Sequence, residues 1–217
     1  MRNTFGAIAL LVISVSAMAE EPTFTPTIKI GSTLFAAFTQ HASPLSKDAN
    51  GNDYHASSFT LARAYINVTG NVHPRVSFRI TPDISRETGS GSSLSGSMQF
   101  RIKYAYAQLS LDEWMSKGSW ARFGVQQTPF LDFTEATYRY RFQGTLFPER
   151  EGYLSSSDAG VSLRYALPRE FGDVHAGIYN GDGYAKAEAY DQKALQVRAT
   201  VRPLKGLRAT IFYDGDH

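Results

Sequence analysis

Basic side chains recur along the chain at spacings that place them on one side of extended strands. Successive side chains of a strand point to opposite faces, and this alternation groups eleven cations: Lys29, Arg63, Arg75, Arg79, Arg101, Lys103, Arg122, Arg164, Arg198, Arg202 and Arg208. Acids are few on this side, and Asp83 is among them. Cations fixed along a confined, water-filled surface lower the barrier to a negative solute. The pattern therefore predicts a surface that attracts small anions, although arginine stems also pack well at ordinary solvated strand positions.

A pore walled by such strands would use nine of these cations as its lining. The predicted lining residues are Lys29, Arg63, Arg79, Arg101, Lys103, Arg122, Arg164, Arg198 and Arg208.

A second group of charges lies in a 30-residue segment, 128–157, between two predicted strands. The group consists of Asp132, Glu135, Arg139 and Arg141, and the segment also contains seven aromatic residues. A long loop so rich in aromatics is more often functional than disordered. We expect the segment to fold into the pore and narrow it, with Arg139 and Arg141 facing the solute and the aromatics packed on the wall. The alternative is an external loop packed on itself or on a neighbouring subunit.

Residues suited to catalysis or metal binding are not grouped in this sequence. The chain has no cysteine, which excludes thiol nucleophiles and thiolate metal ligands. The histidines are scattered and show neither metal-site nor nucleophile–base spacing; they are His41, His55, His73, His175 and His217. We therefore expect no catalytic residue, no metal and no cofactor. An outer-membrane enzyme such as a lipid hydrolase is the alternative, and esterase activity lost on changing a single serine would identify it.

Nine segments of alternating apolar and polar residues supply the strands that must position these charges. They are 27–39, 59–69, 76–83, 98–111, 119–127, 158–167, 174–180, 193–202 and 207–213. The gaps between them are alternately long and short, which is typical of barrels with tight turns at one rim and long loops at the other. The sequence therefore predicts an all-β fold, a transmembrane antiparallel up-and-down β-barrel.

The strand faces opposite the cations are apolar and uncharged. Hydrocarbon requires this, because a cation at the middle of the bilayer costs about 2–4 kcal/mol on such a barrel. In the fourth segment Ile102 and Tyr104 belong to the apolar face, whereas Leu109 and Leu111 fall on the opposite one. A β-bulge within the segment would return the two leucines to the apolar side.

The first 19 residues have the features of a secretory signal peptide. A positive start precedes an apolar core at 5–15, and Ala17-Met18-Ala19 forms a small-x-small cleavage site. We expect cleavage before Glu20, a single domain over 20–217 and delivery to the outer membrane of a Gram-negative cell. The formal net charge of +2 is too small to suggest nucleic-acid binding.

Five segments of the chain resemble the bacterial porins of the phosphate-selective O and P type. They are 59–64 (FTLARA), 75–83 (RVSFRITPD), 123–130 (FGVQQTPF), 179–183 (YNGDG) and 197–206. The resemblance implies a trimeric channel in outer-membrane lipid for passive diffusion of small hydrophilic solutes, with a preference for anions, phosphate-like anions among them. It implies no catalysis and no cofactor.

The sequence departs from this family at its end. Porin barrels have about sixteen strands or more, and single-chain bacterial barrels have an even number, whereas nine strands are predicted here. We therefore expect this chain to form about half of a larger barrel. A secreted soluble β-sandwich is the other alternative, and solubility without detergent would distinguish it.

Overall fold

One antiparallel sheet of nine long strands dominates the computed structural model, which describes residues 24–87, 91, 93–189 and 191–215. Strands that are neighbours in the chain are neighbours in the sheet, so the topology is up-and-down. The strands are β1 (Thr27–Gln40), β4 (Ser57–His73), β5 (Val76–Arg86), β6 (Met98–Ser110), β7 (Trp120–Gln127), β8 (Ser157–Ala166), β9 (Gly172–Tyr179), β10 (Ala194–Leu204) and β11 (Leu207–Gly215). The nine predicted strands and the all-β class are confirmed. The predicted signal peptide, residues 1–19, lies outside the described residues.

Short elements occupy several of the connections. They are the hairpin pair β2 (Ser46–Lys47) and β3 (Asp53–Tyr54), then α1 (Pro129–Glu135), the 3-10 turn η1 (Arg141–Gln143) and α2 (Phe147–Arg150) between β7 and β8, and the 3-10 turn η2 (Pro168–Glu170) between β8 and β9. Pro129 stands in the first turn of α1, where its missing N–H removes no helical hydrogen bond. None of the helices in the described part of the chain is long and apolar enough to cross a membrane.

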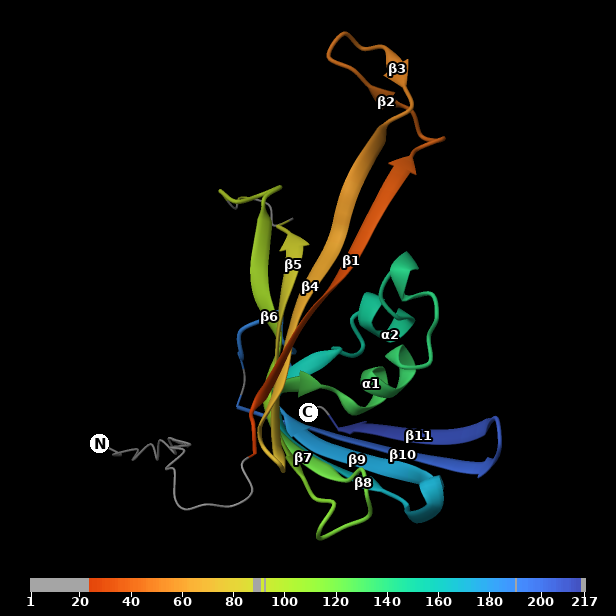
Figure 1. The fold of residues 1–217 in the computed structure, drawn as a ribbon. Helices are drawn as coiled ribbons and strands as arrows, with labels where there is room; N and C mark the ends of the chain where they lie inside the picture. The colour runs from red at the N-terminus through yellow and green to blue at the C-terminus, as the bar shows by residue number, and fades with distance from the viewer. Residues whose placement is uncertain (1–23, 88–90, 92, 190, 216–217) are drawn as a thin grey trace, which may run out of the picture.

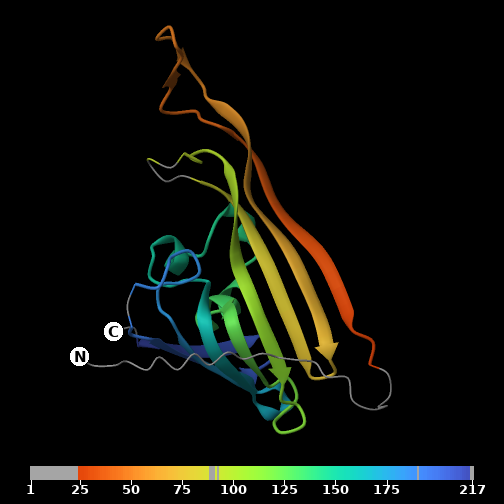
Figure 2. The same ribbon diagram turned by 90° about the vertical axis from the view of Figure 1, so that its left-hand side faces the viewer.

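The sheet is strongly curved and open. In Figure 1, β4, β5 and β6 stand upright, β7 to β11 bend away below them, and α1 and α2 lie in the hollow between; Figure 2 gives the same sheet from the side. The β1–β4 hairpin extends well beyond the other strands. Within the described residues β1 pairs only with β4, and β11 pairs only with β10. The predicted barrel is therefore not closed here, and the sheet has a convex face and a concave face.

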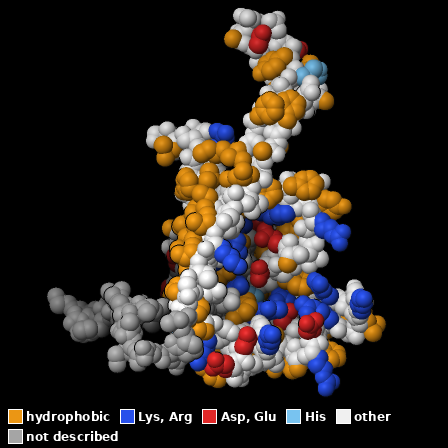
Figure 3. All heavy atoms as spheres, in the orientation of Figure 1, with side chains coloured by type: hydrophobic (Ala, Val, Ile, Leu, Met, Phe, Trp, Pro, Cys, Tyr) orange, Lys and Arg blue, Asp and Glu red, His pale blue; other side chains and the backbone are white. Residues whose placement is uncertain are grey.

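The convex face is apolar and exposed. One row of directly opposed residues crosses six strands: Phe78, Ala107, Phe123, Val161, Ile178 and Leu195. The exposed fractions of Phe123, Val161 and Ile178 are 63%, 50% and 51%. Figure 3 shows apolar side chains along the outer side of β4 to β6, with acidic and basic ones gathered on the other side of these strands. Soluble monomers rarely expose apolar surface this extensive.

Burial in this chain is the reverse of the usual pattern. Among the described residues, 16 buried side chains are polar or charged and 7 are hydrophobic. Side chains such as Asp83, Gln126 and Arg198 are almost fully buried, although such residues usually lie at the surface of soluble proteins. The polar interior therefore lies on the concave side, and the apolar groups face outward.

A register shift in β6 reverses which residues face the concave side. Thr81 of β5 lies opposite Tyr104 and the next residue, Pro82, lies opposite Ile102, so Lys103 is the extra residue of a β-bulge. The bulge expected from Leu109 and Leu111 is thus present. The assignment of Tyr104 to the apolar face was wrong: its ring is buried under the Arg79 guanidinium, 4.4 Å from ring centroid to guanidinium carbon.

Candidate functional site

Strand pairing gathers basic side chains from distant parts of the sequence into one row on the concave face. Across β7 to β10, Trp120 lies opposite Arg164, Arg164 opposite His175, and His175 opposite Arg198. Directly opposed residues have Cβ atoms about 4.5–5.5 Å apart, where like charges destabilise a sheet. Arg164 and Arg198 are not directly opposed, since His175 stands between them, but two guanidinium groups in one row still favour a carboxylate nearby.

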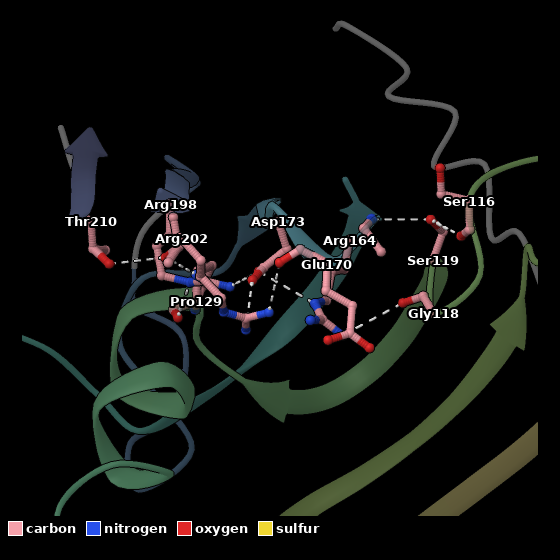
Figure 4. Close-up of polar contacts among 12 residues, drawn as sticks. Ser116, Gly118, Ser119, Pro129, Arg164, Glu170, Asp173, Arg198, Arg202 and Thr210 are labelled. Carbon is pink, nitrogen blue, oxygen red and sulfur yellow. Dashed lines mark hydrogen bonds and ion pairs between the residues drawn. The ribbon is translucent and has the colours of Figure 1, made fainter. Parts of the chain in front are cut away.

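Asp173 of β9 supplies that carboxylate. Its Oδ2 accepts hydrogen bonds from Arg164 Nε at 3.3 Å and from Arg198 Nη2, and its Oδ1 lies 4.0 Å from Arg202 Nη2. Figure 4 shows the Asp173 carboxylate between these arginines. The side chains of Asp173 and Arg198 are only 3% and 5% exposed. One buried carboxylate thus serves three guanidinium groups, and the cluster keeps a positive charge.

A cavity of about 260 Å³ opens at this cluster. It is lined by five arginines and two acids, with three aromatic side chains: Arg122, Arg164, Arg198, Arg202, Arg208, Asp132, Asp173, Trp120, Phe133 and His175. Five guanidinium groups against two carboxylates leave a formal excess of three positive charges. The predicted lining residues Arg122, Arg164, Arg198 and Arg208 are therefore brought together at one place.

Arg122 is held by neutral groups. Its Nε donates to Gln108 Oε1 at 2.8 Å and its Nη1 donates to Gln127 Oε1 at 3.2 Å. The guanidinium carbon lies 3.8 Å from the ring centroid of Trp120. Because these partners carry no charge, the positive charge of Arg122 is not cancelled by its hydrogen bonds.

A second charged cluster surrounds Asp83 of β5. This fully buried carboxylate lies 3.7 Å from Arg63 Nε through Oδ1 and 2.9 Å from Arg101 Nη2 through Oδ2. Lys103 Nζ lies 3.5 Å from the hydroxyl of Tyr65. Three predicted lining residues, Arg63, Arg101 and Lys103, thus meet here, apart from the Asp173 cluster.

The last two predicted lining residues flank a third hollow on the concave face. Lys29 of β1 and Arg79 of β5 line a cavity of about 300 Å³. Arg79 also donates to Asn67 Oδ1 at 2.8 Å and to Thr81 Oγ1 at 3.0 Å. All nine predicted lining cations therefore lie on the concave side, divided among three clusters.

The 128–157 segment lies in the hollow of the sheet, and Arg198 fixes its start. Arg198 Nε donates to the Pro129 carbonyl at 3.0 Å, and its guanidinium carbon is 4.9 Å from the Phe133 ring centroid. Phe130 stacks on Phe212 of β11 with ring centroids 5.0 Å apart, and Leu131 is fully buried. The helix α1 is thus anchored to the concave wall by one cation and by apolar contacts.

The charges of this segment are placed differently from the prediction. Arg141 Nε pairs with Glu135 Oε1 at 3.1 Å, and Arg141 Nη1 donates to the Gly144 carbonyl, so this cation is not presented bare to a solute. Arg139 is exposed and lines a groove of about 1150 Å³ between the segment and the β10–β11 turn. Of the two arginines expected to face a solute, only Arg139 is therefore open.

The expectation that the aromatics of this segment pack on the wall is correct for two residues only. Phe130 and Phe133 make the contacts described above. Five others are exposed: Tyr138, Tyr140, Phe142, Phe147 and Tyr153. Tyr140 contacts Tyr138 and Phe142, with centroids 6.1 and 6.2 Å apart. In the described part of the chain these five side chains have no strand to pack against, because the sheet is open between β1 and β11.

Asp132, on α1, gives a prediction for the dependence of stability on pH. Burial raises the pKa of Asp132 above its ordinary 3.8, against the attraction of Arg122 and Arg198. The ionised form therefore costs folding free energy above that raised pKa, and the cost disappears as the pH falls through it. We expect Asp132→Asn to be more stable than wild type at pH 7 and to lose this advantage towards pH 4, measured by urea denaturation in detergent.

Asp48 is the matched control, because its pKa is shifted the other way. The Asn52 side chain and backbone donate to the Asp48 carboxylate and lower its pKa. Asp48→Asn should therefore be less stable than wild type at neutral pH, with a difference that shrinks as the pH falls. If the stability advantage of Asp132→Asn over the wild type grew towards acid pH, the raised pKa of Asp132 would be contradicted.

Sequence reasoning missed Asp173 and Tyr184 of these clusters. Asp173 lies just before the predicted strand 174–180 and two residues before His175, so it shares the face of His175; the same alternation could have found it. Tyr184, in the β9–β10 connection, donates to Asp83 Oδ2 at 3.3 Å. No local pattern marks Tyr184, because its partner is 101 residues away in the chain.

Comparisons with protein families, with curated proteins and with solved structures found no match for this chain. Among the residues that the structure describes, no group of three or more histidine, aspartate or glutamate side chains is placed to hold a metal ion. An assignment of function therefore depends on the chain's own geometry.

Proposed function

We propose that this chain forms the wall of a water-filled outer-membrane channel through which small hydrophilic solutes diffuse passively, with a preference for anions. The single observation that carries the proposal is the two-faced sheet, apolar and exposed on its convex side and cationic on its concave side. The proposal includes a Gram-negative outer membrane as the location, a homotrimer of porin type, and neither catalysis nor a cofactor.

The convex face supports a lipid environment. Its exposed apolar side chains gain about 25 cal/mol per Å² when they leave water. The strands are 8 to 17 residues long, and a tilted strand needs about 9–11 residues to cross the hydrocarbon core. The sheet is thus able to present an apolar band of the height that a bilayer requires.

The concave face supports the anion preference. The cavity at Asp173 carries a formal excess of three positive charges, and the Asp83 cluster sets Arg63, Arg101 and Lys103 against one carboxylate. Fixed charges on a confined aqueous surface raise the local concentration of counter-ions. The buried aspartates reduce this field without cancelling it, which suits a channel that must also release its solute.

A closed channel requires further strands between β1 and β11, since open strand edges in lipid leave backbone groups unpaired. In an up-and-down sheet of nine strands, β1 and β11 run in the same direction. An odd number of additional strands therefore completes an antiparallel barrel. A second copy rotated about the pore axis would instead pair β11 in parallel with β1.

The test is ion selectivity in planar bilayers, measured on the closed barrel that contains these nine strands together with the further strands. We expect reversal potentials in a KCl gradient to favour chloride over potassium. Arg122→Gln should reduce this preference about two- to fivefold, because unit charges 4 Å apart in water interact by about 1 kcal/mol. Lys117→Gln, in the exposed β6–β7 turn, is the control and should leave selectivity unchanged. Cation preference in the wild type would overturn the anion part of the proposal, and absence of current would overturn the channel itself.

A further inference from the structure

The β9–β10 connection turns inward along the start of β8. Asn180 N donates to the Ala159 carbonyl at 2.9 Å, and Tyr184 N donates to the Ser157 carbonyl at 3.0 Å. Gly181 N donates to Asp158 Oδ2 at 2.7 Å. These three bonds hold both ends of the short stretch 180–184 against β8.

Gly183 allows this close approach. Its φ is +76°, and a Cβ at this position would lie 2.4 Å from Ser155 Oγ. Any other residue would therefore meet both backbone strain and a steric clash. The close approach at Gly183 thus places the next residue, Tyr184, in the hollow on the concave side of the sheet.

The Tyr184 side chain reaches across to β5 and β6. Its hydroxyl donates to Asp83 Oδ2 at 3.3 Å. The ring centroid lies 4.9 Å from the guanidinium carbon of Arg101 and 5.7 Å from Lys103 Nζ. One phenol ring therefore covers two of the predicted lining cations and also binds the carboxylate between them.

The chemistry of these contacts explains why the ring stays there. A buried carboxylate is stabilised by hydrogen-bond donors, and a desolvated cation is stabilised by the face of an aromatic ring. Burial raises the pKa of Tyr184, against the attraction of Arg101, so the hydroxyl remains protonated and able to donate. The contact places an aromatic face against Arg101 and Lys103, although the Arg101 side chain is still 31% exposed.

We infer that Tyr184 is a specificity-determining residue, which makes the β9–β10 connection a second internal constriction and limits the access of large anions to Arg101 and Lys103. The inference rests on the proposed channel function. It assigns the lining around Asp83 to a layer in which the ring of Tyr184 covers the cations Arg101 and Lys103.

The test compares chloride with the bulkier anion gluconate in single-channel recordings of the wild type, Tyr184→Ala and Tyr184→Phe. Tyr184→Ala should raise the ratio of gluconate to chloride conductance about twofold, because it opens a constriction lined by fixed cations. Tyr184→Phe keeps the ring over the cations and should retain most of the wild-type ratio. Tyr54→Ala, at an exposed position in β3 of the β2–β3 hairpin, is the control for loss of a tyrosine and should match the wild type.

A second readout does not depend on current. Loss of the Tyr184 contacts should release the connection, so trypsin should cut after the exposed Lys186 several times faster in Tyr184→Ala than in Tyr54→Ala. Absence of current through the wild type would overturn the channel function and this inference together. Current through the wild type with an unchanged gluconate ratio in Tyr184→Ala would overturn the inference alone.

Discussion

Replacement of Asp173 by asparagine is expected to lower the free energy of unfolding by about 3–5 kcal/mol, the cost typical of removing one partner from a buried ion pair. Asp173 accepts hydrogen bonds from Arg164 and Arg198, and Arg202 lies 4.0 Å away. Asparagine has nearly the same shape but no charge. The variant would therefore leave the buried guanidinium of Arg198 without its counter-charge.

The measurement is the urea midpoint and slope of the protein folded in detergent micelles, followed by strand circular dichroism. Asp53→Asn is the matched control, since Asp53 pairs with Lys47 at 2.8 Å but the two side chains are 53% and 67% exposed. Exposed pairs contribute about 0–1 kcal/mol. Similar small losses in both variants would show that the Asp173 cluster does not hold β8, β9 and β10 together.

Introduction of a charge at Val161→Arg should cost about 2–4 kcal/mol in a bilayer, the value for a cation at the middle of an outer-membrane barrel. Val161 lies in the centre of the convex apolar row, between Phe123 and Ile178 on the neighbouring strands. Water would solvate the new guanidinium readily at this half-exposed position, whereas hydrocarbon would not. The same substitution thus separates a lipid-facing surface from the outer face of a soluble sandwich.

The measurement is the fraction of protein folded in lipid vesicles over a urea series. Ser77→Arg, which faces the cavity between Lys29 and Arg79, is the charge-matched control and should change stability by no more than about 0.5–1 kcal/mol. If Val161→Arg were as stable as Ser77→Arg, the convex face would not be the lipid-facing one.

The nine strands were predictable because side-chain alternation is a local property of extended backbone. Each strand carries its own period of two, and the gaps carry turn residues such as Gly206, with its positive φ of 85°. The same alternation put all nine predicted lining cations on one side. It failed within β6, where Lys103 is an extra residue and Tyr104 turns inward. In the sequence, only the position of Leu109 and Leu111 on the side opposite the apolar face indicated that bulge.

The contacts that individual side chains of the 128–157 segment make were less predictable than the strands. The aromatic content indicated an ordered segment, and the segment lies in the hollow. Which aromatics touch the wall depends on where the sheet curves and where it is open, so Phe130 meets Phe212 while Tyr140 stays exposed. The ion pair between Arg141 and Glu135 likewise depends on the turn that separates α1 from η1.

By itself, the sequence determined the number and order of the strands and the division of their side chains into an apolar and a basic face, because both follow from backbone geometry between adjacent residues. Only the tertiary structure decided which cations are neutralised, since Asp173 meets Arg198 and Asp83 meets Arg101 across 25 and 18 residues of chain. Ion pairs and ring contacts depend on distances of a few ångströms between strands. Those distances are set by register, bulges and curvature, none of which a single strand contains.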